Sequence, residues 1–185
     1  MKFYFIFGIL LITTICLKGE IILPKINCNE QEFLEQIDLD STYKEDYDNQ
    51  LFCYLNQYLD AEMDSILYQR LRKFTRKLHF NRIGKNDYQS SKMFANYYAI
   101  FAEKANDLKS YSHALYRIAL CNYRMGSNYE AFDKITEGVS LSRRLKDSSL
   151  LSTQLMRQGW IYWQLYRFED AIESAEEFRK IRIAR

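Results

Sequence analysis

The segment Ala119-Leu-Cys-Asn-Tyr-Arg-Met125 is matched forty residues later by Gly159-Trp-Ile-Tyr-Trp-Gln-Leu165. Each segment begins with a small residue, and twelve positions after that residue stands an alanine, Ala131 in one copy and Ala171 in the other. An internal period of this length is typical of chains built from stacked copies of one supersecondary unit. We therefore expect residues 63–185 to form a helical repeat domain.

Each copy of the repeat is predicted to contain two antiparallel helices. Apolar residues recur at helical spacing, and the 185 residues include only six glycines and one proline to interrupt helices. Gly126-Ser127-Asn128 supplies a turn in one copy, and Tyr166-Arg167 takes that place in the other. A shift of eighty places Ser91 on Ala171, which indicates a third, degenerate copy. The predicted fold class is all-α: a solenoid of about three degenerate antiparallel helix pairs, preceded by an N-terminal targeting helix.

The repeat resembles the tetratricopeptide repeat (TPR) family. The resemblance rests on Gly159-x-x-Tyr162 and Phe168-Glu-Asp-Ala171-Ile172, with Ala119, Ala131 and Gly138 at matching offsets. It departs from the family in its period of forty rather than 34, and in having no proline at the end of either repeat. Within the family, the chain resembles exported TPR proteins and TPR sensor segments of Bacteroidetes-like bacteria.

The resemblance implies a ligand groove lined by the first helix of each pair. With Ala119 and Gly159 at the eighth position of the repeat, the groove positions include Lys73, Arg76, Phe80, Tyr116, Tyr123, Arg124, Trp160 and Trp163. An aromatic groove bordered by cations suits an extended or helical peptide that carries carboxylates. The alternative is that the two tryptophans pack against the neighbouring repeat as core residues.

The net charge of +2 conceals an uneven distribution along the chain. Residues 20–66 hold 12 Asp and Glu against Lys25 and Lys44, whereas residues 70–85 hold seven Lys and Arg and no acid. We favour an amphipathic helix over residues 70–85 whose basic outer face attracts the acidic segment. The alternative is a surface for an anionic partner: an acidic peptide, lipid headgroups or nucleic acid.

The N-terminus has the pattern of a targeting segment. Met1 and Lys2 precede fifteen uncharged and mostly apolar residues, 3–17, which is shorter than the ~20 residues of a spanning helix. We expect residues 1–20 to be a signal peptide, or alternatively an uncleaved membrane anchor, and residues 21–62 to be an acidic helical segment. The mature chain would then be exported to the periplasm or cell envelope.

Residue patterns that carry catalysis are sparse. The two histidines, His79 and His113, are not in a metal-binding spacing, and no nucleophile or phosphate-loop motif is present. Among the cysteines, Cys28 and Cys53 would form a disulfide if their helices approach, and Cys121 lies in an apolar helical run. We therefore expect no enzyme activity, no cofactor and no metal.

The sequence thus predicts an interaction module of the cell envelope that binds a protein or peptide, with an acidic partner favoured by the cations. Export disfavours nucleic acid, whereas the N-terminal segment leaves membrane association open. The amphipathic helix over residues 171–183 has no polar capping helix after it, which leaves self-association open. The alternative function is the N-terminal sensory or scaffolding part of a larger signalling protein, such as a TPR-bearing histidine kinase or DNA-binding regulator.

Overall fold

The computed structural model of the chain describes residues 55–59 and 65–184. The chain divides into two compact units, Met1–Asp60 and Ala61–Arg185. In the first unit, residues 55–57 form one helical turn. The predicted targeting segment and the predicted pairing of Cys28 with Cys53 lie outside the described residues.

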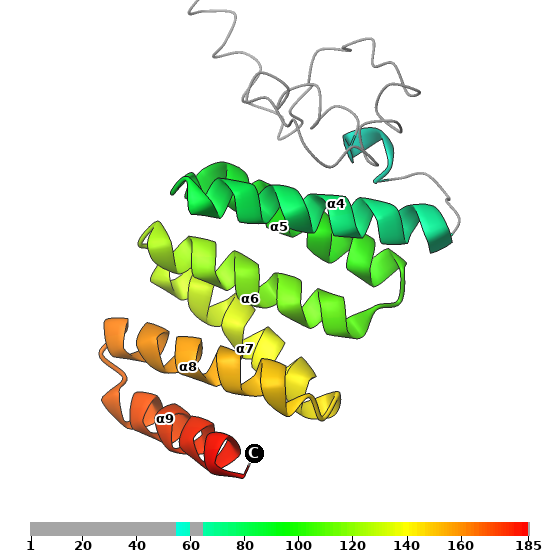
Figure 1. Cartoon of the computed structure of the whole chain (residues 1–185). Coiled ribbons are helices and arrows are strands. Elements are labelled where there is room, and N and C mark those ends of the chain that lie inside the picture. Colours follow the sequence, from blue (N-terminus) through cyan, green and yellow to red (C-terminus); the bar gives the residue numbers. More distant parts are fainter. Residues whose placement is uncertain (1–54, 60–64, 185) are drawn as a thin grey trace, which may run out of the picture. The chain divides into compact units, whose positions relative to one another are not determined.

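The second unit consists of helices packed in consecutive pairs (Figure 1). Over residues 65–184 the helices are α4 (Ser65–Gly84), α5 (Tyr88–Lys104), α6 (Leu108–Arg124), α7 (Asn128–Arg144), α8 (Ser148–Gln164) and α9 (Phe168–Ile183). Each helix packs against the next one along the chain, and α4, α6 and α8 lie in front of α5 and α7 in the view of Figure 1. The prediction of an all-α stack of helix pairs is confirmed for this part of the chain.

The helices follow a register of twenty residues. From α5 to α9, successive helices begin at residues 88, 108, 128, 148 and 168. Two helices with their turns therefore account for the period of forty seen in the sequence. The first helices of the three pairs are α4, α6 and α8, and the second helices are α5, α7 and α9.

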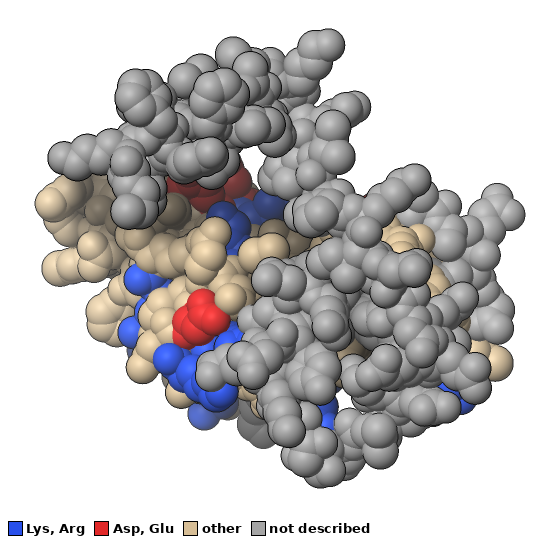
Figure 2. Space-filling model, turned by 90° about the horizontal axis from the view of Figure 1, so that it is seen from above, with Lys and Arg blue, Asp and Glu red and all other residues tan. Residues whose placement is uncertain are grey.

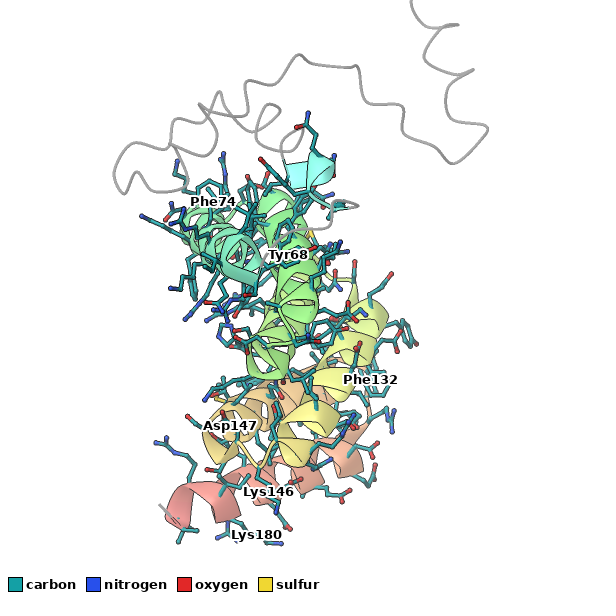
Figure 3. The ribbon with its side chains drawn as sticks, turned by 90° about the vertical axis from the view of Figure 1, so that its right-hand side faces the viewer. Tyr68, Phe74, Phe132, Lys146, Asp147 and Lys180 are labelled. Atoms are coloured by element: carbon teal, nitrogen blue, oxygen red, sulfur yellow. The ribbon has the colours of Figure 1, made fainter. Side chains whose placement is uncertain are left out.

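One type of three-residue turn connects all these helices. Its middle residue has a positive φ in every case: Asn86 61°, Asn106 53°, Gly126 81°, Lys146 53° and Tyr166 59°. The backbone N–H of the third turn residue donates to the carbonyl five residues earlier, at 2.9–3.2 Å, which is the Schellman arrangement of a helix C-terminus. Lys146 and Asp147 mark one such turn, at the end of the stack that faces the viewer in Figure 3.

The third residue of each turn is also the N-cap of the next helix. In three of the turns it is an aspartate, and the carboxylates of Asp87, Asp107 and Asp147 accept the N–H of the residue three positions later. This bond satisfies one of the backbone donors that a helix start leaves unpaired. The turn therefore ends one helix and begins the next within three residues.

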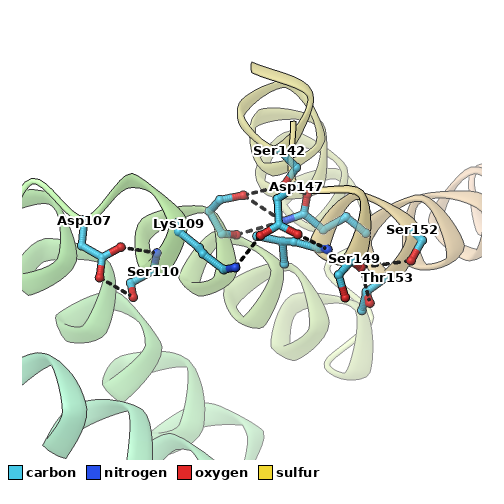
Figure 4. A network of polar contacts seen from close by, with 11 residues as sticks. Asp107, Lys109, Ser110, Ser142, Asp147, Ser149, Ser152 and Thr153 are labelled. Atoms are coloured by element: carbon cyan, nitrogen blue, oxygen red, sulfur yellow. Dashed lines mark hydrogen bonds and ion pairs between the residues drawn. The ribbon is translucent and has the colours of Figure 1, made fainter. Parts of the chain in front are cut away.

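Basic side chains connect these N-caps to the preceding first helix. Figure 4 shows Lys109 of α6, which lies 2.7 Å from the carboxylate of Asp147. Arg72 of α4 likewise forms an ion pair with the carboxylate of Asp107. The bond from Lys109, together with the N–H of Leu150, holds the pKa of Asp147 below its usual range. The N-termini of α6 and α8 are thus each joined to the first helix that precedes them.

Small residues allow the helices of a pair to approach closely. Ala119 of α6 and Ala131 of α7 are fully buried, as predicted from the repeat. At Gly159 an added Cβ would lie 3.5 Å from the carbonyl oxygen of Ala171, so an alanine would fit there as it does at the equivalent Ala119. The position requires a small residue rather than a glycine.

A buried polar network joins α6, α7 and α8. The amide nitrogen of Gln154 donates to the carbonyl of Ser112 at 3.0 Å, and its amide oxygen accepts from the hydroxyl of Ser142 at 2.8 Å. The hydroxyl of Ser112 donates to the carbonyl of Gly138 at 3.1 Å. A Cβ at Gly138 would lie 3.1 Å from the amide nitrogen of Gln154, so glycine leaves room for the network. Buried polar groups satisfied in this way fix how the second and third helix pairs meet.

We predict that Lys146→Gly raises the free energy of unfolding by about 1 kcal/mol, because a side chain at positive φ is strained and glycine is not. Arg144→Gly, two residues earlier in the last turn of α7, should lower it by about 1 kcal/mol, because glycine is unfavourable within a helix. Both side chains are exposed, which makes the two variants a matched pair. Urea unfolding measures both values, and equal destabilisation by the two substitutions would show that the turn geometry is wrong.

Candidate functional site

The predicted binding residues lie on the first helices of the three pairs, and we call their side of the stack the first-helix face. It is made of α4, α6 and α8, and its predicted members are Lys73, Arg76, Phe80, Tyr116, Tyr123, Arg124, Trp160 and Trp163. The structure allows each of them to be placed by its exposure and its contacts.

The two tryptophans of α8 are surface residues. Trp160 is 55% exposed and Trp163 is 58% exposed, so they do not pack as core residues of the neighbouring repeat. The ring of Trp163 meets Phe168 of α9 edge to face, with centroids 5.0 Å apart, and Phe168 in turn meets Tyr166 at 6.2 Å. We call Trp160, Trp163, Tyr166 and Phe168 the aromatic patch. Exposed apolar surface of this kind marks interaction sites.

Phe80 of α4 lies beneath an arginine from the next first helix. The guanidinium carbon of Arg117 on α6 is 4.2 Å from the centroid of the Phe80 ring, and that of Arg76 is 5.7 Å away. Arg117 also lies 5.2 Å from the ring of Tyr116, which is itself almost fully buried. The structure thus brings Arg76, Phe80 and Tyr116 together around Arg117.

A similar contact occurs one repeat later, with a ring one turn further along the preceding first helix. Arg157 of α8 lies 5.3 Å from the ring of Tyr123 on α6. Each following first helix therefore places an arginine over an aromatic ring of the preceding one, a favourable cation–π contact. Arg117 and Arg157 were not among the residues predicted from the sequence. Arg117 and Arg157 are forty residues apart, so they occupy the same position in two copies of the repeat. That equivalence is the sequence signal by which they could have been identified.

Two of the predicted residues stand apart from these clusters. Lys73 on α4 and Arg124 on α6 are exposed side chains, and none of their contacts within the described part of the chain joins them to the other six. We therefore place Lys73 and Arg124 at the edge of the first-helix face, outside the two arginine–aromatic clusters.

The α4 side of the face has an excess of positive charge. Within residues 55–59 and 65–184, no carboxylate forms an ion pair with Lys73, Arg76 or Arg117. Seen from the α4 end (Figure 2), the described surface shows groups of Lys and Arg with few carboxylates between them. Burial, helped by the charges of Arg117 and Arg76, lowers the pKa of His113 to about 3, so this imidazole is neutral at physiological pH.

His79 belongs to a buried polar cluster between α4, α5 and α6. Its Nδ1 lies 3.1 Å from the carbonyl of Ser91, and the thiol of Cys121 lies 3.5 Å from the hydroxyl of Ser91. All three residues are fully buried. Burial lowers the pKa of His79 to about 4 and raises the pKa of the Cys121 thiol. A neutral imidazole and a protonated thiol without solvent access form a structural cluster, not a nucleophilic one.

A pocket of about 240 Å³ lies between α7, α8 and α9. Two of its carboxylates are already paired, Asp170 with Arg167 at 2.7 Å and Glu177 with Arg143 at 2.5 Å. Among the residues that the structure describes, no group of three or more His, Cys, Asp or Glu is placed to hold a metal ion. In that same part of the chain, no helix combines the length and the apolar character needed to span a membrane.

The chain matches no model of a known protein family and no curated protein.

We predict that the free energy of unfolding falls as the pH is lowered from 7 to 5. In the unfolded chain both histidines titrate near pH 6.5, whereas in the folded protein the pKa of His79 is about 4 and that of His113 about 3. The unfolded chain therefore binds more protons in this interval, which costs about 2 kcal/mol for each histidine. Depressed carboxyl pKa values, such as that of Asp147, add a further loss only at lower pH.

Urea unfolding at the two pH values measures this difference, and His113→Gln should remove about half of it. Proton NMR of the imidazole C2–H groups provides an independent reading. A native histidine that titrates near pH 6.5 would contradict the assigned burial.

Proposed function

We propose that residues 65–184 are a TPR-like interaction module whose first-helix face binds a segment of another protein. The observation that carries the proposal is the exposure of Trp160 and Trp163 on α8, at repeat positions where α4 carries Phe80 and α6 carries Tyr123. Export to the cell envelope is part of the proposal and rests on the apolar run at residues 3–17.

The aromatic patch has the properties of a binding anchor. Burying a large aromatic side chain at an interface typically contributes ~2 kcal/mol or more to binding. Trp163 is already oriented by its edge-to-face contact with Phe168, so less rotamer freedom is lost when a partner covers it. A partner that brings apolar side chains to this patch would gain most of its affinity there.

The arginines of the face favour a partner with acidic residues. Arg117 and Arg157 are fixed over aromatic rings, and Arg76 lies beside Phe80 without a carboxylate partner in the described residues. Guanidinium groups held in this way present N–H donors to carboxylates at little cost in side-chain entropy. Complementary charge at such positions raises the association rate and selects against basic partners.

To test the proposal, random peptides displayed on phage are selected for binding to the full chain, which contains residues 65–184. We expect enriched peptides to contain Asp or Glu together with apolar residues. Calorimetric titration should then show that Trp163→Ala weakens binding of the best peptide by about tenfold or more. Tyr129→Ala is the matched control, because Tyr129 is an aromatic residue that is 76% exposed and belongs to a second helix, α7. Its effect should stay within about twofold.

Circular dichroism of each variant establishes that the helices are intact, as the exposure of Trp163 predicts. Equal binding by wild type and Trp163→Ala, or equal losses for Trp163→Ala and Tyr129→Ala, would contradict the proposal. Enrichment of peptides without acidic residues would contradict the preference for an acidic partner, but it would still agree with a binding site on the first-helix face.

A further inference from the structure

We propose that the outer face of α9 pairs with α9 of a second copy of this chain, in antiparallel orientation. α9 is the last helix of the stack in Figure 1, and no described helix covers its outer side. The proposal does not depend on the proposed function, and the outer face of α9 shares only Phe168 with the aromatic patch.

The outer face of α9 carries exposed apolar side chains at coiled-coil spacing. Ile172 is 61% exposed and Ile183 is 74% exposed, and Ala175 and Arg179 lie between them on the same side of the helix. Intervals of three and four residues place these side chains in one stripe along the helix. The opposite side of α9, which includes the buried Ser174, faces α8.

The charges of α9 are divided between its two halves. Glu169, Asp170, Glu173, Glu176 and Glu177 occupy the N-terminal part, and Arg179, Lys180 and Arg182 occupy the C-terminal part. Lys180, labelled in Figure 3, projects from this last helix. A parallel pair would bring like charges together, whereas an antiparallel pair brings the acidic half of each helix to the basic half of the other.

The antiparallel register follows from a two-fold axis near Ala175. It places Ile172 opposite Arg179 of the second copy, with the carboxylates of Glu169 and Glu176 of the first copy one turn to either side of that arginine. Phe168 then lies opposite Ile183 of the second copy. Because the axis repeats every contact, each favourable pair occurs twice. One complementary helix face is thus enough for a closed dimer.

The area of a single helix pair predicts a weak dimer. An interface of one 16-residue helix from each copy is at the low end of the range for specific complexes, so we expect a dissociation constant in the micromolar range. Sedimentation velocity of the full chain over a concentration series measures it. Ile172→Glu should raise the dissociation constant by about tenfold or more, and Tyr129→Glu, on an exposed site of α7, should leave it unchanged.

A charge-swap pair tests whether attraction between opposite charges on the two α9 helices holds the dimer together. One variant carries Glu169→Lys, Glu173→Lys and Glu176→Lys, and the other carries Arg179→Glu, Lys180→Glu and Arg182→Glu. Each variant alone should be monomeric, because its α9 then repels a second copy, and an equimolar mixture should form a heterodimer.

The proposal is overturned if the wild-type chain remains monomeric at every concentration, or if Ile172→Glu and Tyr129→Glu dimerise equally well. It is also overturned if the two charge variants fail to associate when mixed. In the monomeric case the outer face of α9 would belong to another segment or to a different protein. Helical content from circular dichroism is measured for all variants, and the wild-type concentration series decides the question even if a variant fails to fold.

Discussion

A single backbone hydrogen bond, from the N–H of each N-cap residue to the carbonyl five residues earlier, sets the register of the whole helical stack. It recurs in all five turns between α4 and α9, at 2.9–3.2 Å. The bond requires a positive φ at the middle turn residue, and the chain adopts that conformation even at Lys146 and Tyr166. Because α5, α6, α7 and α8 each have 17 residues and every turn has the same length and geometry, each helix from α6 to α9 begins twenty residues after the preceding one. The side chains of alternate helices are therefore brought into line.

Because of this register, small buried residues bring the helices close together, and two arginines connect successive helices of the first-helix face. The buried Ala119 and Ala131 let α6 and α7 approach closely, and the amide of Gln154 fixes α8 against both. With the helices held in this way, Arg117 reaches back to Phe80 and Arg157 reaches back to Tyr123. On α8 the equivalent positions carry Trp160 and Trp163, which no arginine covers among the described contacts. The proposed anchor of the face is therefore the last member of a series that begins on α4.

Much of this arrangement was predictable from the period of forty. The repeat identified the helix pairs, the small residues of the α6–α7 contact, and a turn at residues 166–167 that has no glycine or proline. It did not show that Tyr116 would be covered or that the tryptophans would be exposed, because helical spacing assigns a face but not how deeply that face is packed. The arginines at 117 and 157 were missed because a cation in an amphipathic helix is usually solvated. The network of Gln154 depends on three helices meeting, which no local pattern encodes.

The central claim is that the ligand surface lies on α4, α6 and α8. Hydroxyl-radical footprinting of the full chain with and without a selected peptide tests it most directly, because the method reports the solvent access of individual aromatic side chains. We predict that binding reduces the oxidation of Phe80, Tyr123, Trp160 and Trp163 and leaves the oxidation of Tyr129 on α7 unchanged. Protection of Tyr129 while both tryptophans stay as reactive as in the free protein would contradict it.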